Sequence, residues 1–265
     1  DPPDAVLSVR AILSKDSSNI TPCDWQLIAR TIKDLHKEFD GIVVLHGTDT
    51  MAYSAAAVEF MTLGVPIPVI FTGAQRPIGA GNLCDALHAA CCELLRGVFV
   101  VFDGVILNGC NVSKFDTTED HAFDSVIGQP VGRIENGRVQ VCATPRRCTD
   151  PNFFWRTALA ANVLLLKITP GFDPALLDIA RLRHDRVLVL EAFGLGGLPT
   201  QDGTLLEDAC ECELSDRKDT KTKAKCMLYC LLSKLTKKEL PWGTLTGIRP
   251  TKIARTMLME GASDE

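Results

Sequence analysis

The segment 45–51 (Leu-His-Gly-Thr-Asp-Thr-Met) carries the residues best suited to chemistry, at a point where a predicted buried strand passes into a helical pattern. The free N–H groups and the dipole at a helix start favour binding of a carboxylate. Thr48 adds a hydroxyl, and Asp49 adds a carboxylate that can hold an ammonium group or orient a base. A site that binds both ends of an α-amino acid needs this pair. The alternative is a plain helix cap, because Gly, Thr and Asp are also common at such junctions for capping alone.

Two further polar clusters are candidates for the same site. Asp16, Ser17 and Ser18 precede the first predicted helix, in a loop that suits recognition of a charged small molecule but equally suits an ordinary turn. Lys114 lies among hydroxyl residues just after a predicted strand. A partly buried lysine can lose its proton and activate a hydroxyl, whereas a surface lysine is the alternative interpretation.

Alternating helix and strand patterns must position these side chains. A helix start is predicted at Thr21–Asp24, where Thr21 can cap, the next residue is proline and Asp24 can complete a capping box. The patterns that follow predict a strand at 41–45 buried on both faces, a helix after residue 50, a strand at 69–71, a helix at 82–95 and a strand at 98–102. This order predicts an α/β fold with a parallel sheet and ligands at the carboxyl ends of its strands.

A second, smaller unit is predicted after a connector. Its pattern is a strand at 163–168, a Pro-Gly turn, a helix at 174–182 and a strand at 187–190. The predicted domains are therefore residues 1–150, a linker at 151–162, a partial α/β domain at 163–212 and an unrelated helical tail at 213–265. The tail opens on a charged stretch and continues as an amphipathic helix.

Composition narrows the class of protein. Of the 265 residues, 46% are apolar and 23% are charged, which is typical of a globular chain. A net charge of −5 argues against a nucleic-acid partner. The longest apolar runs are far shorter than the roughly 20 residues that cross a membrane, and no signal peptide opens the chain. We therefore expect a cytoplasmic protein with no membrane partner, and the first residue, Asp1, indicates that the start is missing.

The 11 cysteines fit a reducing compartment. They are scattered, and those in apolar stretches, such as Cys84, Cys91, Cys92 and Cys142, are predicted to be reduced core thiols. Four other cysteines could form a zinc site, but their spacing does not match a zinc ribbon: Cys210, Cys212, Cys226 and Cys230. One face of a helix explains Cys226 and Cys230, which are four residues apart. We expect no metal and no cofactor.

Several motifs in order give the first 210 residues a resemblance to bacterial type I L-asparaginases. The matching stretches are 16–19 with 21, 22 and 25, then 46–53, 72–77, 112–114, 121–125, 170–171 and 190–194. The resemblance implies a Rossmann-like parallel α/β domain followed by a second α/β domain, in homodimers or homotetramers. It also implies hydrolysis of L-asparagine, with L-glutamine as a further substrate, to the acid and ammonia through an acyl-enzyme on a threonine, without metal or cofactor.

Site roles follow from the same resemblance. Thr48 corresponds to one of the family's two catalytic threonines, and Lys114 and Asp49 complete its Thr-Lys-Asp relay. Lys114 would act as the base, while Asp49 would orient it and bind the substrate ammonium. Asp16, Ser17 and Ser18 resemble the loop that clamps the substrate.

The sequence also departs from the family pattern. It contains no Thr-Gly-Gly-Thr motif, where the family's other threonine lies, the loop at 75–82 is shorter, Asn111 replaces a common arginine, and the second domain is truncated. Residues of about 225–253 instead resemble oxygen-independent coproporphyrinogen dehydrogenases, without their three-cysteine motif. Two alternatives follow: an inactive amino-acid-binding remnant or chimeric fragment, and the asparaginase-like subunit of a transfer-RNA-dependent amidotransferase.

Overall fold

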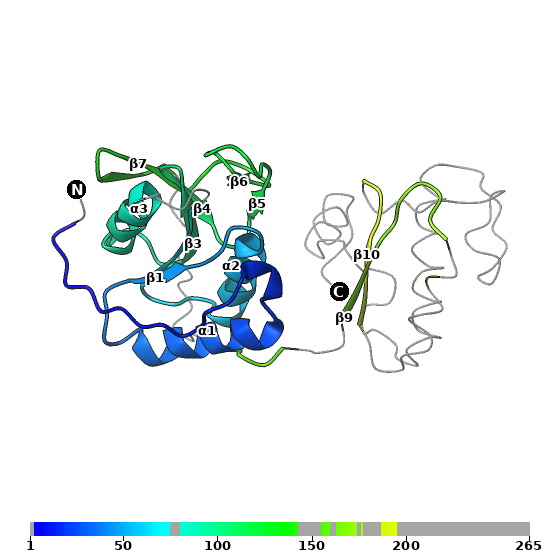
Figure 1. Ribbon diagram of the computed structural model, residues 1–265, viewed down its shortest axis with the longest axis horizontal. Coiled ribbons are helices and arrows are strands. Elements are labelled where there is room, and N and C mark those ends of the chain that lie inside the picture. The colour runs from blue at the N-terminus through cyan, green and yellow to red at the C-terminus, as the bar shows by residue number, and fades with distance from the viewer. Residues whose placement is uncertain are drawn as a thin grey trace, which may run out of the picture. The chain divides into compact units, whose positions relative to one another are not determined.

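A computed structural model of the chain describes residues 3–74, 80–142, 155–159, 163–173, 176 and 187–194. The chain divides into two compact units, Asp1–Leu159 and Ala160–Glu265 (Figure 1). The predicted borders at 150, 162 and 212 stay predictions. The tail, the resemblance of residues 225–253 and the four cysteines of the possible zinc site lie outside the described residues.

The first unit begins with helices and parallel strands and continues with short antiparallel strands. Its elements are η1 (Ser17–Asn19), α1 (Pro22–Leu35), β1 (Ile42–Leu45), α2 (Met51–Met61), β2 (Pro68–Thr72), α3 (Ala80–Ala90), β3 (Gly97–Phe102), β4 (Val105–Asn108), β5 (Val112–Lys114), β6 (Phe123–Ser125), β7 (Gly132–Glu135) and β8 (Arg138–Val141). The predicted helices and strands up to residue 102 are confirmed, except that α3 ends at Ala90, before the predicted residue 95.

Six strands form one sheet in the order β1-β2-β3-β4-β7-β8. β1, β2 and β3 run parallel, as predicted, but β4, β7 and β8 are added antiparallel. The predicted parallel sheet is therefore confirmed for β1, β2 and β3, and the antiparallel strands extend it beyond the strands that the sequence predicted. Asp103-Gly104 and Asn136-Gly137 connect antiparallel neighbours with both residues at positive φ, which is the conformation that two-residue hairpin loops require.

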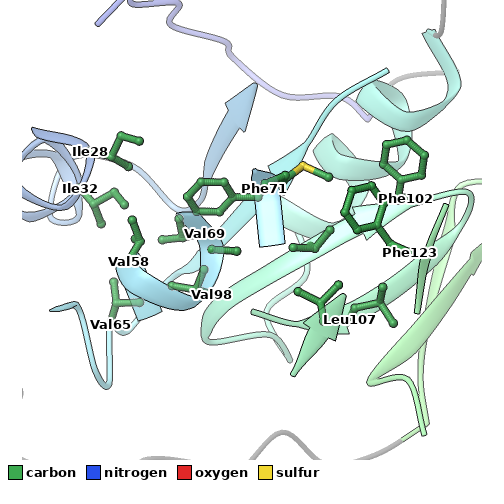
Figure 2. Packing of buried hydrophobic residues seen from close by; sticks show 14 of the residues in the cluster. Ile28, Ile32, Val58, Val65, Val69, Phe71, Val98, Phe102, Leu107 and Phe123 are labelled. Atoms are coloured by element: carbon green, nitrogen blue, oxygen red, sulfur yellow. The ribbon is translucent and has the colours of Figure 1, made fainter. Parts of the chain in front are cut away.

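The sheet buries both faces. α1 and α2 cover one face through residues such as Ile28, Ile32 and Val58, which pack on Val69 and Phe71 of β2 (Figure 2). α3 covers the other face, with alanines packed on the alternate residues of β2 and β3. Because successive strand residues point to opposite faces, β2 is buried along its whole length.

β1 lies at one edge of this sheet and is only half-buried, with Leu45 at 66% exposure. The prediction that 41–45 is buried on both faces is therefore wrong, because a strand with one neighbour cannot be covered as a central strand is. Residues 5–13 have apolar side chains at every second position yet join no strand in the described structure. Within them, Val6 and Val9 are 99% and 93% exposed.

The cysteines differ from expectation. Cys91 and Cys142 are exposed, and Cys84 and Cys92 are only half-buried. The core-thiol prediction is wrong for the two exposed residues because Cys91 follows the end of α3 and Cys142 follows the end of the edge strand β8. The cysteines that the structure describes are all unpaired thiols.

The second unit contains a parallel pair of strands in its described part. β9 (Val163–Lys167) pairs with β10 (Val187–Glu191), and Lys167 Nζ lies 2.7 Å from Glu191 Oε1. The two predicted strands are confirmed, whereas the predicted helix at 174–182 lies almost wholly outside the described residues. In the described part of the whole chain, no helix is both long and apolar enough to cross a membrane.

Candidate active site

Three of the predicted site residues meet. The Nζ of Lys114 lies 3.0 Å from the Oγ1 of Thr48 and 2.9 Å from the Oδ1 of Asp49. Lys114 is only 13% exposed, whereas the Asp49 side chain is 65% exposed. The amine is therefore shielded and paired, while the carboxylate beside it remains open to a ligand.

A small β-hairpin positions Lys114. β5 pairs antiparallel with β6, with Lys114 opposite Phe123. Phe123 is buried and its ring lies 4.9 Å from that of Phe102 at the end of β3. The lysine backbone is thus fixed to the core, and its side chain reaches the β1–α2 turn.

A hydrogen-bonded chain of side chains holds the other half of the site. The Trp25 Nε1–H donates to Ser54 Oγ at 2.8 Å, and Ser54 Oγ lies 2.9 Å from His46 Nε2. His46 Nδ1 lies 2.7 Å from the carbonyl of Gly47. Since a carbonyl only accepts, His46 donates from Nδ1 and accepts the Ser54 hydroxyl proton at Nε2. Burial lowers the pKa of His46, in agreement with this neutral ring.

The predicted substrate loop packs directly against this turn. A Cβ on Gly47 would lie 2.5 Å from Ser17 Oγ, so only glycine allows the approach. The Thr50 hydroxyl donates to the Ser17 carbonyl at 2.7 Å. Ser17 is buried, which makes it part of the wall of the turn rather than an open surface group.

Asp16 and Ser18 form a local turn at the rim of the same loop. The Oδ1 of Asp16 accepts hydrogen bonds from the Ser18 N–H at 2.8 Å and from the Ser18 hydroxyl at 2.6 Å. These bonds, the side-chain one first, lower the pKa of Asp16 and keep it ionised. The loop thus forms the local turn that was one of the two interpretations of its sequence. It also packs against the β1–α2 turn, which carries Thr48.

The chemistry of the site rests on hydroxyl, amine and carboxylate groups. In the part of the chain that the structure describes, no three His, Cys, Asp or Glu side chains group as metal ligands do. A hydroxyl in contact with a shielded amine is the arrangement of an activated nucleophile, and the carboxylate orients the amine.

Comparison with known proteins agrees with this geometry. The family model described as Asparaginase, N-terminal, matches residues 4–147. The chain belongs to the asparaginase family. It is 36% identical over 213 residues to an L-asparaginase of Thermococcus kodakarensis, covering 78% of this chain and 64% of that protein. The solved structure of the thermostable L-asparaginase from that organism superposes with a TM-score of 0.71 at 35% identity, over 77% of this chain and 63% of the other.

Relatives with other names match the same region. A glutamyl-tRNA(Gln) amidotransferase subunit of Methanosarcina mazei is 33% identical, over 72% of this chain and 48% of that protein. The mouse 60 kDa lysophospholipase is 31% identical, over 72% of this chain and 35% of that protein. The chain thus spans less than two thirds of each relative. The family and the α/β fold are what these comparisons have in common.

Sequence reasoning missed the supporting residues of this candidate site. Trp25 and His46 lie in stretches that match the family, but no pattern indicated that Trp25, Ser54 and His46 form one hydrogen-bonded chain. His46 and Ser54 are eight residues apart, on either side of the strand–helix junction. This spacing was the available signal, but the two side chains meet only because α2 folds back beside the end of β1.

Proposed function

We propose that this chain is an L-asparaginase-type amidohydrolase that converts L-asparagine to L-aspartate and ammonia, and accepts L-glutamine as a second substrate. The observation that supports it is the contact of Lys114 with both Thr48 and Asp49. The substrate is inferred from the family, because the geometry alone fits any small amide with a charged amino group.

In the proposed reaction, Lys114 in its neutral form takes the proton of the Thr48 hydroxyl, and the Thr48 oxygen bonds to the side-chain amide carbon. The carbon–nitrogen bond breaks, and the nitrogen takes the proton from Lys114 and leaves as ammonia. Water then hydrolyses the ester, which releases aspartate and restores Thr48. Asp49 orients Lys114 and binds the substrate ammonium, while Asp16, Ser17 and Ser18 bind the rest of the substrate.

Thr48 is the nucleophile in this proposal because its hydroxyl oxygen lies 3.0 Å from the Lys114 amine. The competing hypothesis is a chain that binds the amino acid and turns none over. Loss of one acyl-enzyme nucleophile removes orders of magnitude in rate while binding groups survive.

Ammonia release from millimolar asparagine, followed by a coupled assay, tests the proposal. We expect Lys114→Ala to lower kcat/KM by about 10²–10⁴, the usual contribution of a positioned base. Lys33→Ala, an exposed lysine on α1, is the matched control and should leave the rate unchanged. Binding of aspartate by calorimetry without ammonia release would support the inactive alternative.

A second candidate function is that of the amidotransferase subunit, which several relatives with that name support. The same assay separates the two functions. A chain that hydrolyses glutamine in preference to asparagine, or only with a partner protein, favours the amidotransferase function. Preference for asparagine by the chain alone favours the asparaginase.

Assembly and location extend the proposal. We propose a homodimer or homotetramer in the cytoplasm and ancestry among the bacterial type I enzymes. Light scattering coupled to size exclusion measures the assembly directly.

A further inference from the structure

Glu59 is a half-buried acid that none of the proposed chemistry uses. It lies on α2, the helix that begins just after Thr48 and Asp49. Its Oε2 is fully buried and has no hydrogen-bond partner in the described part of the chain, and its Oε1 accepts from the Asn108 side-chain amide at 3.5 Å. A buried carboxyl oxygen without a partner carries a cost in stability, so its retention requires an explanation.

Asn108 connects Glu59 to the turn that leads into β5. Its Oδ1 accepts hydrogen bonds from the Cys110 backbone N–H at 3.2 Å and from the Cys110 thiol at 3.1 Å. Its carbonyl accepts from the Asn111 N–H at 3.0 Å. The turn therefore has its shape set by Asn108, and Lys114 follows three residues after it.

Gly109 makes the close approach of this turn to α2 sterically feasible. A Cβ at this position would lie 2.9 Å from Glu59 Oε2 and 3.0 Å from the Val98 carbonyl. The Gly109 N–H donates to that same carbonyl at 3.0 Å. The turn is thus held between the strand β3 and the acid on α2, and α2 also packs against β5.

We propose that Glu59 is a positioning residue for Lys114: it joins α2, which begins just after Thr48 and Asp49, to the 108–111 turn, which sets the register of β5. One carboxyl thereby couples the two chain segments, 65 residues apart, that form the proposed relay. Its consequence for catalysis rests on the proposed function, whereas the structural link does not.

The charge state of Glu59 controls this link. The one titratable group facing it in the described structure is the Cys110 thiol, whose residue also turns its backbone N–H toward the carboxyl. Burial raises the pKa of Glu59, so the neutral acid persists to higher pH than in an exposed glutamate, while the hydrogen bonds from Cys110 and Asn108 favour the ionised form. Ionisation at still higher pH makes the carboxylate a stronger acceptor for the Asn108 amide and tightens the contact with the turn.

The test measures the reactivity of Lys114 itself in the full chain. The chain is acylated briefly with acetic anhydride, and the modification of Lys114 relative to exposed Lys33 is determined by peptide mass spectrometry. In Glu59→Ala we expect the relative rate to rise by about tenfold, the factor that corresponds to about 1.4 kcal/mol of lost hydrogen bonding to Thr48 and Asp49. Glu93→Ala, at an exposed acid, is the control.

Glu59→Gln keeps the shape and hydrogen-bonding capacity of the neutral acid but cannot ionise. Between roughly pH 5 and 9, a range that includes the values known for buried glutamates, the relative reactivity of Lys114 should fall with pH in the parent chain and stay flat in Glu59→Gln, because the ionised carboxylate holds the turn more tightly. An unchanged rate in folded Glu59→Ala overturns the proposal, and so does the same pH profile in Glu59→Gln and the parent. If Glu59→Ala fails to fold, the comparison of pH profiles between Glu59→Gln and the parent chain still tests the proposal.

Turnover provides a separate readout. If the parent releases ammonia, Glu59→Ala should lower kcat with little change in KM, and Glu59→Gln should restore it near neutral pH. If the parent releases none, the proposed function fails while the labelling still decides the role of Glu59.

Discussion

At the scale of single residues, the site depends on side chains that never touch a substrate. Ser54 is fully buried and serves as acceptor for Trp25 and donor for His46. We expect Ser54→Ala to lower the free energy of unfolding by about 1–3 kcal/mol, because it removes two hydrogen bonds, to half-buried Trp25 and His46. Urea unfolding at neutral pH measures this loss. A change below experimental error would mean that the chain of hydrogen bonds contributes nothing.

His46 makes that stability depend on pH. Its folded pKa lies below the ordinary value of 6.5, so the unfolded chain binds its proton more readily. The contribution of neutral His46 is therefore complete above pH 6.5 and is lost as pH falls from 6.5 through the lower folded pKa. In His46→Gln this part of the pH dependence should disappear, whereas exposed His121→Gln should keep it. Equal pH dependence of unfolding in both variants would contradict the assignment.

The residues of the relay illustrate what sequence can and cannot provide. Thr48 and Asp49 were found from their place between an apolar run and a helix, which is a local pattern. Lys114 was a candidate from the hydroxyl residues around it, but its pairing with Thr48 and Asp49 came from the resemblance, because no local signal reports a partner 65 residues away. Glu59 was missed for the same reason: its partner Asn108 becomes a neighbour only when α2 packs beside β4 and β5.

At the scale of elements, local chemistry predicted the first half of the fold well. The capping interaction predicted for Asp24 exists, since its Oδ2 accepts from the Thr21 N–H at 2.7 Å. The antiparallel half was missed although its signals were present. Asp103-Gly104 and Asn136-Gly137 are two-residue hairpin loops between short strands, and such dipeptides are strong local hairpin signals. The burial of β1 could not be predicted, because an apolar run does not reveal how many neighbours a strand acquires.

Two glycine substitutions should have opposite effects on these elements. Gly137 has φ +73° in the β7–β8 loop, and a Cβ there would lie 3.0 Å from His88 Nε2. Gly137→Ala should therefore destabilise the fold by about 1–2 kcal/mol. Gly81 lies in α3 with nothing within 4 Å of a built Cβ, so Gly81→Ala should stabilise by about 0.5–1 kcal/mol. Thermal unfolding of both variants checks the signs, and a shift in the same direction would contradict the assigned conformations.

At the scale of the whole molecule, the first unit alone contains the complete proposed relay, because Thr48, Asp49 and Lys114 all lie in Asp1–Leu159. The same unit exposes apolar strand-forming residues. β1 ends the sheet, and residues 5–13 alternate apolar side chains without pairing in the described structure. Open edges and unpaired strand segments template association with another chain. The open edge at β1 and the unpaired residues 5–13 thus favour self-association.

This exposure predicts concentration-dependent association that specific charges suppress. Val6 and Val9 are almost fully exposed, and Val6→Lys combined with Val9→Lys should lower the mass-average size measured by static light scattering, because lysine on an unpaired strand opposes edge pairing. Ile127→Lys, at an apolar side chain that is 77% exposed outside any strand, is the matched control and should change the size little. If the control reduces association as much as the double substitution, general surface hydrophobicity is the cause. If neither variant changes the size, residues 5–13 play no part in association and the edge is covered in solution.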